Sequence, residues 1–127
     1  MVPGGRCDSG AGAGTAMGKG SVMSKPKLVR DKIPYIIENS GKIPVTRILG
    51  DEEYTACLHR KLDEEVAEFH QDKNGEELAD LLEVVYALAA DLGISREMLM
   101  EIYAQKHETR GGFSRRIYLE DITDKCL

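Results

Sequence analysis

Two segments of this sequence place acidic residues inside apolar helical stripes, and this arrangement limits what the chain can fold into. In segment 51–72 the apolar side chains recur with the period of an α-helix, at Tyr54, Leu58, Leu62, Val66 and Phe69. At about 100° per residue they lie between about −20° and +100° from the direction of Glu65. Glu65 therefore falls inside the stripe that should face a core, while Glu68 lies at its border, at about −60°.

The segment 76–91 repeats this pattern. With Glu77 as the zero direction, its apolar side chains again fill about −20° to +100°, and Asp80 lies at about −60°. The connection Lys73-Asn74-Gly75 is short, and such links join antiparallel helix neighbours. We therefore expect Glu65, Glu68, Glu77 and Asp80 to converge near the interior of a helix pair.

Converging carboxylates suggest a metal site. Unpaired, they would repel one another and resist removal from water. A hard divalent cation relieves both effects, and an oxygen-only ligand set favours Mg²⁺, or Mn²⁺ as a substitute, over zinc. A di-iron bundle would use Glu-x-x-His, but alanine stands three residues before each histidine. The alternative interpretation is that these acids form a solvated helix surface.

The rest of the sequence predicts a small all-α domain. Residues 1–22 hold seven of the thirteen glycines and almost no large apolar side chains, so we expect a flexible, disordered leader. Residues 23–127 are expected to form one domain, an antiparallel helical bundle. It would contain a short helix capped by Asp31, the two long helices, and a third that starts at Ser95 and ends near Gly111.

Charge and cysteine content exclude several classes of protein. The net charge of −5 is the wrong sign for binding nucleic acid through its phosphates, and no apolar run reaches membrane-spanning length. The three scattered cysteines form neither a disulfide framework nor a zinc-ligand spacing, which is typical of a reducing compartment. We therefore expect a cytoplasmic protein without nucleic-acid or membrane partners.

The acidic motifs also resemble those of a known superfamily. Glu65-Val-Ala-Glu68 followed by Glu77-Leu-Ala-Asp80 is similar to the ExxE…ExxD signature of MazG-like nucleoside triphosphate pyrophosphohydrolases. The blocks LVRDKIP, KLDEEVAEF, EELADLLEVVYAL and K-x-x-x-RGGF resemble its small phosphoribosyl-ATP pyrophosphohydrolase-like subfamily, over about residues 27–119. Only eight residues separate Glu68 from Glu77, fewer than is usual in the superfamily, so a substrate-contacting loop is expected to be absent.

The resemblance implies a function and an assembly. It implies a MazG-like helical bundle completed by oligomerisation to at least a homodimer, with Mg²⁺ held by the four acids. The implied reaction is hydrolysis of the α–β phosphoanhydride of a nucleotide, which gives a nucleoside monophosphate and pyrophosphate. We expect Glu65 and Glu68 to be the catalytic residues, with Glu65 accepting the proton of the attacking water.

Cationic side chains would complete a nucleotide site. Lys106 and Arg110 are four residues apart on the third long helix and match the K-x-x-x-R of the last block. Arg30 and Lys32 belong to LVRDKIP, and Lys61 lies on the acidic face itself. Each of these cations alone is as readily explained by a solvated charge or a structural ion pair.

Two other functions remain open at this point. One is a non-catalytic helical dimer that binds a nucleotide or a partner protein. The other is a narrower activity, pyrophosphohydrolysis of phosphoribosyl-ATP, which the name of the subfamily suggests. The sequence does not identify the base or sugar of the substrate, because its aromatic residues in segments 51–72 and 76–91 lie at core spacing.

Overall fold

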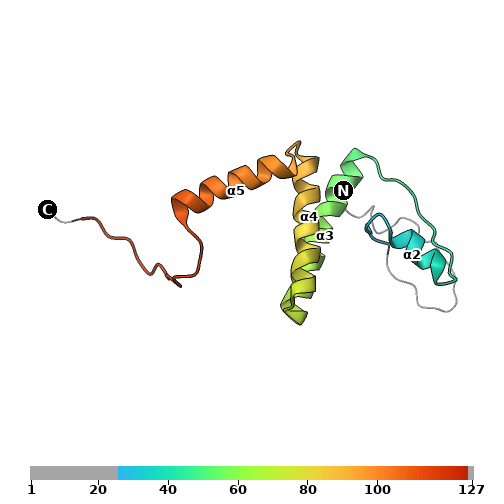
Figure 1. Cartoon of the computed structure of the whole chain (residues 1–127), viewed down its shortest axis with the longest axis horizontal. Helices are drawn as coiled ribbons and strands as arrows, with labels where there is room; N and C mark the ends of the chain where they lie inside the picture. Colours follow the sequence, from blue (N-terminus) through green and yellow to red (C-terminus); the bar gives the residue numbers. More distant parts are fainter. Residues whose placement is uncertain (1–25, 126–127) are drawn as a thin grey trace. The chain divides into compact units, whose positions relative to one another are not determined.

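The structure is a computed structural model that describes residues 26–125, so the predicted leader, residues 1–22, lies outside the described residues. The described part is helical and contains no β-strand, as the sequence predicts. Its helices are shown in Figure 1: α2 (Ile33–Asn39), α3 (Asp51–Asp72), α4 (Gly75–Asp91) and α5 (Arg96–Arg110). The chain divides after Gly93 into two units, the first with α2, α3 and α4 and the second with α5.

The N-cap of the short helix α2 lies one residue later than the sequence predicts. Lys32, not Asp31, is the N-cap, and no side chain caps this end. The prediction for Asp31 is wrong because a backbone turn occupies this position, in which the Ile33 N–H donates to the carbonyl oxygen of Arg30 at 3.0 Å. Pro34 lies in the first turn of the helix, where the absence of its N–H costs no helical hydrogen bond.

The long helices α3 and α4 form a tight hairpin. Helix α3 starts and ends where the sequence predicts, with three acids in its first turn, where the helix dipole favours negative charge. It stops at Lys73, which adopts a left-handed conformation with φ 51° and ψ 47°. Asn74 then caps α4, because its side chain accepts a hydrogen bond from the Glu77 N–H at 2.9 Å. The two-residue link, Lys73 and Asn74, thus turns the chain and fixes the position of Glu77.

Few side chains of the described residues are buried, and they lie on the helices of this hairpin. The buried apolar residues are Cys57, Leu58, Val84 and Ala89. Leu78 and Leu92, which the helical pattern places on the inner face of α4, are 49% and 76% exposed instead. The prediction of burial is wrong for both, and their exposure leaves apolar surface near the two ends of α4 that the hairpin does not cover.

Cys57 is buried on α3. The other two cysteines, Cys7 and Cys126, lie outside the described residues, so the expectation of a reducing, cytoplasmic compartment stays a prediction.

The second unit consists of α5 and the segment that follows it. Ser95 caps α5 as predicted, since its hydroxyl accepts a hydrogen bond from the Met98 N–H at 3.1 Å. The helix ends at Gly111, whose φ of +77° lies in the region that favours glycine. Residues 112–125 form no helix or strand, and apolar side chains such as Phe113 are exposed.

A search of the described helices finds none that is both long and apolar enough to pass through a bilayer.

Candidate metal centre

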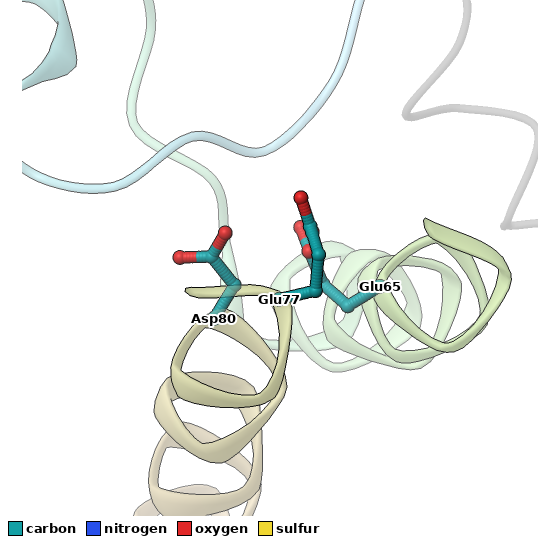
Figure 2. A group of neighbouring side chains, drawn as sticks. All are labelled: Glu65, Glu77 and Asp80. Atoms are coloured by element: carbon teal, nitrogen blue, oxygen red, sulfur yellow. The ribbon is translucent and has the colours of Figure 1, made fainter. Parts of the chain in front are cut away.

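Three carboxylates meet at the closed end of the α3–α4 hairpin. Glu65 on α3 and Glu77 and Asp80 on α4 each offer one oxygen, and these oxygens all lie within 4.8 Å of one another. Figure 2 shows the three side chains projecting toward the same side of the helix pair. The expected convergence is therefore observed for these three acids, which we call the acid cluster.

Glu65 is the most buried member of the acid cluster. Its residue surface is only 7% exposed, which confirms that it lies within the inward-facing sector of α3. Its Oε1 is buried without a hydrogen-bond partner, while its Oε2 lies 3.5 Å from the Nζ of Lys61. One oxygen of this carboxylate thus has a cation beside it, and the other is left for a ligand.

Glu77 is held at the start of α4. It lies in the first helical turn, where its backbone N–H donates to the side chain of Asn74. Its Oε1 is also buried and has no hydrogen-bond partner. An orphaned buried oxygen is costly, so two of them in one cluster indicate a place for a positively charged ligand.

Asp80 lies at the more exposed edge of the acid cluster and already has a cationic partner. The Nη1 of Arg30 donates a hydrogen bond to its Oδ1 at 3.0 Å. The Nη2 of the same guanidinium lies 3.7 Å from the Oε1 of Glu83, one turn further along α4. Arg30 therefore links the segment before α2 to the rim of the cluster.

The electrostatics of the cluster disfavour its ionised form. Burial raises the pKa of Glu65, and the negative charges of Glu68 and Asp80 raise it further, against the lowering effect of Lys61. The pKa of Glu77 is raised as well, first by desolvation and then by repulsion from its acidic neighbours, Glu68 foremost. Mutual repulsion of this kind is what a bound cation would relieve.

Glu68 is the expected ligand that lies outside the group of three. It is exposed on α3, and its carboxylate does not meet the other three within 4.8 Å. Its charge nevertheless raises the pKa of both Glu65 and Glu77, so it lies near enough to act on the cluster through space.

The expected substrate-binding cations are divided between the two units. Lys61 and Arg30 lie at the acid cluster, and Lys32 is exposed at the start of α2. Lys106 and Arg110 are exposed on α5, which belongs to the second unit.

Sequence reasoning missed one cation, Lys27. Its Nζ lies 3.7 Å from the Oε2 of Glu64 on α3. The available signal was a basic run, with cations at positions 25, 27, 30 and 32 of an acidic chain.

The donor chemistry of the cluster fits a hard divalent cation. All three groups offer carboxylate oxygens, and two of the buried oxygens have no other partner. Oxygen donors of this kind suit Mg²⁺ and Mn²⁺. The residues that would hold such an ion are Glu65, Glu77 and Asp80, with Glu68 at the side.

Comparison with known proteins gives little guidance. No protein-family model matches the chain, and no solved structure matches it. An uncharacterized protein of Mycolicibacterium smegmatis is 62% identical over 42 residues, which is 33% of this chain. The matched part spans 43% of that relative, and its description names no activity. The chain is thus similar to an uncharacterized bacterial protein over a third of its length.

Proposed function

We propose that this protein is a Mg²⁺-dependent nucleotide pyrophosphohydrolase, which hydrolyses the α–β phosphoanhydride of a nucleoside triphosphate or related nucleotide. The observation that supports this most is the meeting of Glu65, Glu77 and Asp80, whose oxygens lie within 4.8 Å of one another. The order of acidic motifs in the sequence supplies the reaction class, and the cluster offers a place for the ion that such a reaction uses.

The charge of the chain makes a metal necessary for this function. A net charge of −5 repels a polyphosphate, so carboxylates and phosphates need a cation between them. When bound, Mg²⁺ would polarise the phosphoryl oxygens and neutralise the charge that develops on the leaving pyrophosphate. Mn²⁺ would serve as a substitute because it accepts the same oxygen donors.

Glu65 is the proposed general base. It is the most buried carboxylate of the acid cluster, and an oxygen of it that the ion does not take up could accept the proton of the attacking water. Lys61 lies 3.5 Å from its Oε2 and would keep the side chain oriented. Glu68, which is exposed beside the cluster, is the second proposed catalytic residue, since it could relay that proton to solvent.

Arg30 and Lys61 are the proposed phosphate contacts nearest to the cluster. The planar guanidinium of Arg30 suits bidentate contact with phosphate oxygens, and its ion pair with Glu83 on α4 keeps it at the rim of the cluster. Lys32 is proposed as a further contact because it is exposed at the start of α2, while Lys106 and Arg110 stay expectations from the sequence.

The same proposal includes assembly with a second copy of the chain. The hairpin buries few apolar side chains of its own, and large ones such as Leu92 and Ile48 are 76% and 94% exposed. Burial of such surfaces against another copy would supply the hydrophobic stabilisation that a two-helix unit lacks.

A substrate panel tests the proposed reaction. Full-length protein is incubated with nucleoside triphosphates and phosphoribosyl-ATP at saturating Mg²⁺, and released pyrophosphate is measured. Glu77→Gln should lower the rate about 100-fold or more, because loss of a metal ligand removes several kcal/mol of transition-state stabilisation. Glu76→Gln is the matched control, since Glu76 is the preceding acid of the same helical turn and is exposed. Absence of pyrophosphate from every nucleotide, with metal bound, would refute the reaction.

A non-catalytic nucleotide- or partner-binding role is the second candidate. One observation favours it: Lys61 and Arg30 already lie beside Glu65 and Asp80, so the cluster is partly neutralised by the chain itself. In that case nucleotide would bind without turnover, and Glu68→Gln would leave both its affinity and the oligomeric state unchanged. Nucleotide affinity, measured by equilibrium binding, and oligomeric state, measured by light scattering, are compared between the unsubstituted protein and Glu68→Gln to separate this role from the enzymatic one.

A further inference from the structure

A short basic segment before α2 contacts both helices of the hairpin beside the acid cluster. We call residues 27–30 the basic strap. Its Lys27 lies 3.7 Å from Glu64 on α3, and its Arg30 lies 3.0 Å from Asp80 and 3.7 Å from Glu83 on α4. Arg30 is the member that contacts a residue of the acid cluster itself.

An excess of negative charge around the acid cluster favours a cation such as Arg30 beside it. Seven carboxylates lie in the cluster, pair with a cation beside it or act on it through space, against three cations, so a formal excess of four negative charges remains. The carboxylates are Glu64, Glu65, Glu68, Asp72, Glu77, Asp80 and Glu83, and the cations are Lys27, Arg30 and Lys61. Without a metal ion, Arg30 reduces the repulsion by partnering Asp80, whose side chain is 40% exposed.

A divalent cation on the same three carboxylates would compete with Arg30. Two positive groups close to one carboxylate repel each other, so each lowers the affinity of the site for the other. The side chains of Arg30 and Asp80 are 58% and 40% exposed, and exposed ion pairs are weak and screened by salt. The guanidinium would be displaced easily, and it has a second acceptor in Glu83.

We propose that Arg30 is a built-in counter-cation of the acid cluster, which holds Asp80 in the metal-free protein and releases it when a divalent cation binds. The basic strap thereby reports metal occupancy: Arg30 contacts Asp80 and Glu83 without metal, and Glu83 alone with metal. The inference rests on the metal-binding part of the proposed function and is independent of the reaction.

Metal affinity tests this competition directly. Binding of Mn²⁺ to the full-length chain is measured by calorimetry at low ionic strength for the unsubstituted protein, Arg30→Gln and Arg47→Gln. Arg47 is the matched control, because it pairs with Glu53 on α3 through hydrogen bonds of 2.9 and 3.1 Å and contacts no cluster residue. Arg30→Gln should bind Mn²⁺ about fivefold more tightly, and Arg47→Gln should bind it unchanged.

A second measurement uses the unsubstituted protein, so that it does not depend on how a variant folds. During a Mg²⁺ titration, the side-chain ¹⁵N signal of Arg30 should move and that of Arg47 should stay in place.

Two results would overturn the inference. Equal or weaker Mn²⁺ binding by folded Arg30→Gln would show that Arg30 positions Asp80 and does not compete for it. If the ¹⁵N signal of Arg30 does not move while Mg²⁺ binds, the proposed release of Asp80 by Arg30 is refuted. Metal binding without pyrophosphate release would instead refute only the reaction proposed above.

Discussion

Glu65 offers the sharpest test of the metal centre. Its substitution by glutamine should stabilise the metal-free protein and destabilise the metal-bound one. Without metal, Glu65→Gln removes a buried charge that is repelled by Glu68 and Asp80, and whose Oε1 has no partner. The gain comes from removing a charge that burial and its acidic neighbours disfavour, because the amide of glutamine is neutral but is still a buried polar group. Loss of the Lys61 contact offsets about 0.5–1 kcal/mol of this gain. We expect the metal-free variant to be more stable than the unsubstituted protein by about 1 kcal/mol, or about 4 °C in melting temperature.

With metal, the order should reverse. A ligand present at about 100 times its Kd stabilises the folded state by about 2.7 kcal/mol. Glu65→Gln should lose most of this gain, because the substitution replaces a charged carboxylate ligand of the metal ion by a neutral amide. The assay is thermal unfolding followed by circular dichroism, in EDTA and in saturating Mg²⁺. Protein concentration is held fixed, because oligomerisation would make the melting temperature depend on it.

Glu76→Gln provides the control for Glu65→Gln, since it removes one negative charge from an exposed position of the hairpin. It should change neither melting curve by more than about 0.5 kcal/mol. The reasoning is refuted if Glu65→Gln is less stable than the unsubstituted protein in EDTA and Mg²⁺ leaves the difference between them unchanged.

Three further predictions concern the hairpin and its ionisation. The pKa values of Glu65 and Glu77 are raised on folding, so the folded state binds more protons than the unfolded state. The stability of the metal-free protein should therefore rise as the pH falls from 7 through these raised pKa values, and it should level off below the pKa of an ordinary glutamate. Urea unfolding measures this, and saturating Mg²⁺ should reverse the trend because protons then compete with the ion. Asn74→Ala should cost about 1 kcal/mol of stability and also weaken Mg²⁺ binding, whereas Ser95→Ala, which removes the cap of α5, should cost a similar amount with Mg²⁺ affinity unchanged. Lys73→Gly should increase the free energy of unfolding by about 1 kcal/mol, because Lys73 has φ 51° and glycine adopts this conformation without strain. Thermal unfolding should show the increase as a higher melting temperature.

The sequence predicts local structure well where several signals coincide. The bounds of α3 follow from acids in the first turn, an apolar stripe with helical period and the Lys73-Asn74-Gly75 link. The burial of Glu65 follows from the same stripe and is confirmed. At Asp31 a residue type alone supported the cap, and a backbone turn occupies that place instead.

The border residues show where a pattern along one helix ceases to be sufficient. Glu68 and Asp80 have the same angular offset of about −60° from the inward acid of their helices. Asp80 nevertheless joins the acid cluster, and Glu68 remains exposed outside it. The way two helices cross decides which border residue faces its neighbour, and helical periodicity does not encode that crossing.

The sequence also did not predict contacts between segments that lie far apart along the chain. Arg30 meets Asp80 across fifty positions of chain, and Lys27 meets Glu64. No local period or cap signals such a pairing, because it depends on where the segment before α2 returns to the hairpin.

The two-residue link between α3 and α4 affects how the protein would acquire a metal ion. All members of the acid cluster come from positions 65–80, so they are brought together by closure of one short loop. Local contacts of this kind form early in folding, ahead of pairings between remote segments. A nascent or partly folded chain should therefore capture the ion before the rest of the molecule is in place, and the ion would then act as a template that favours the hairpin over competing conformations.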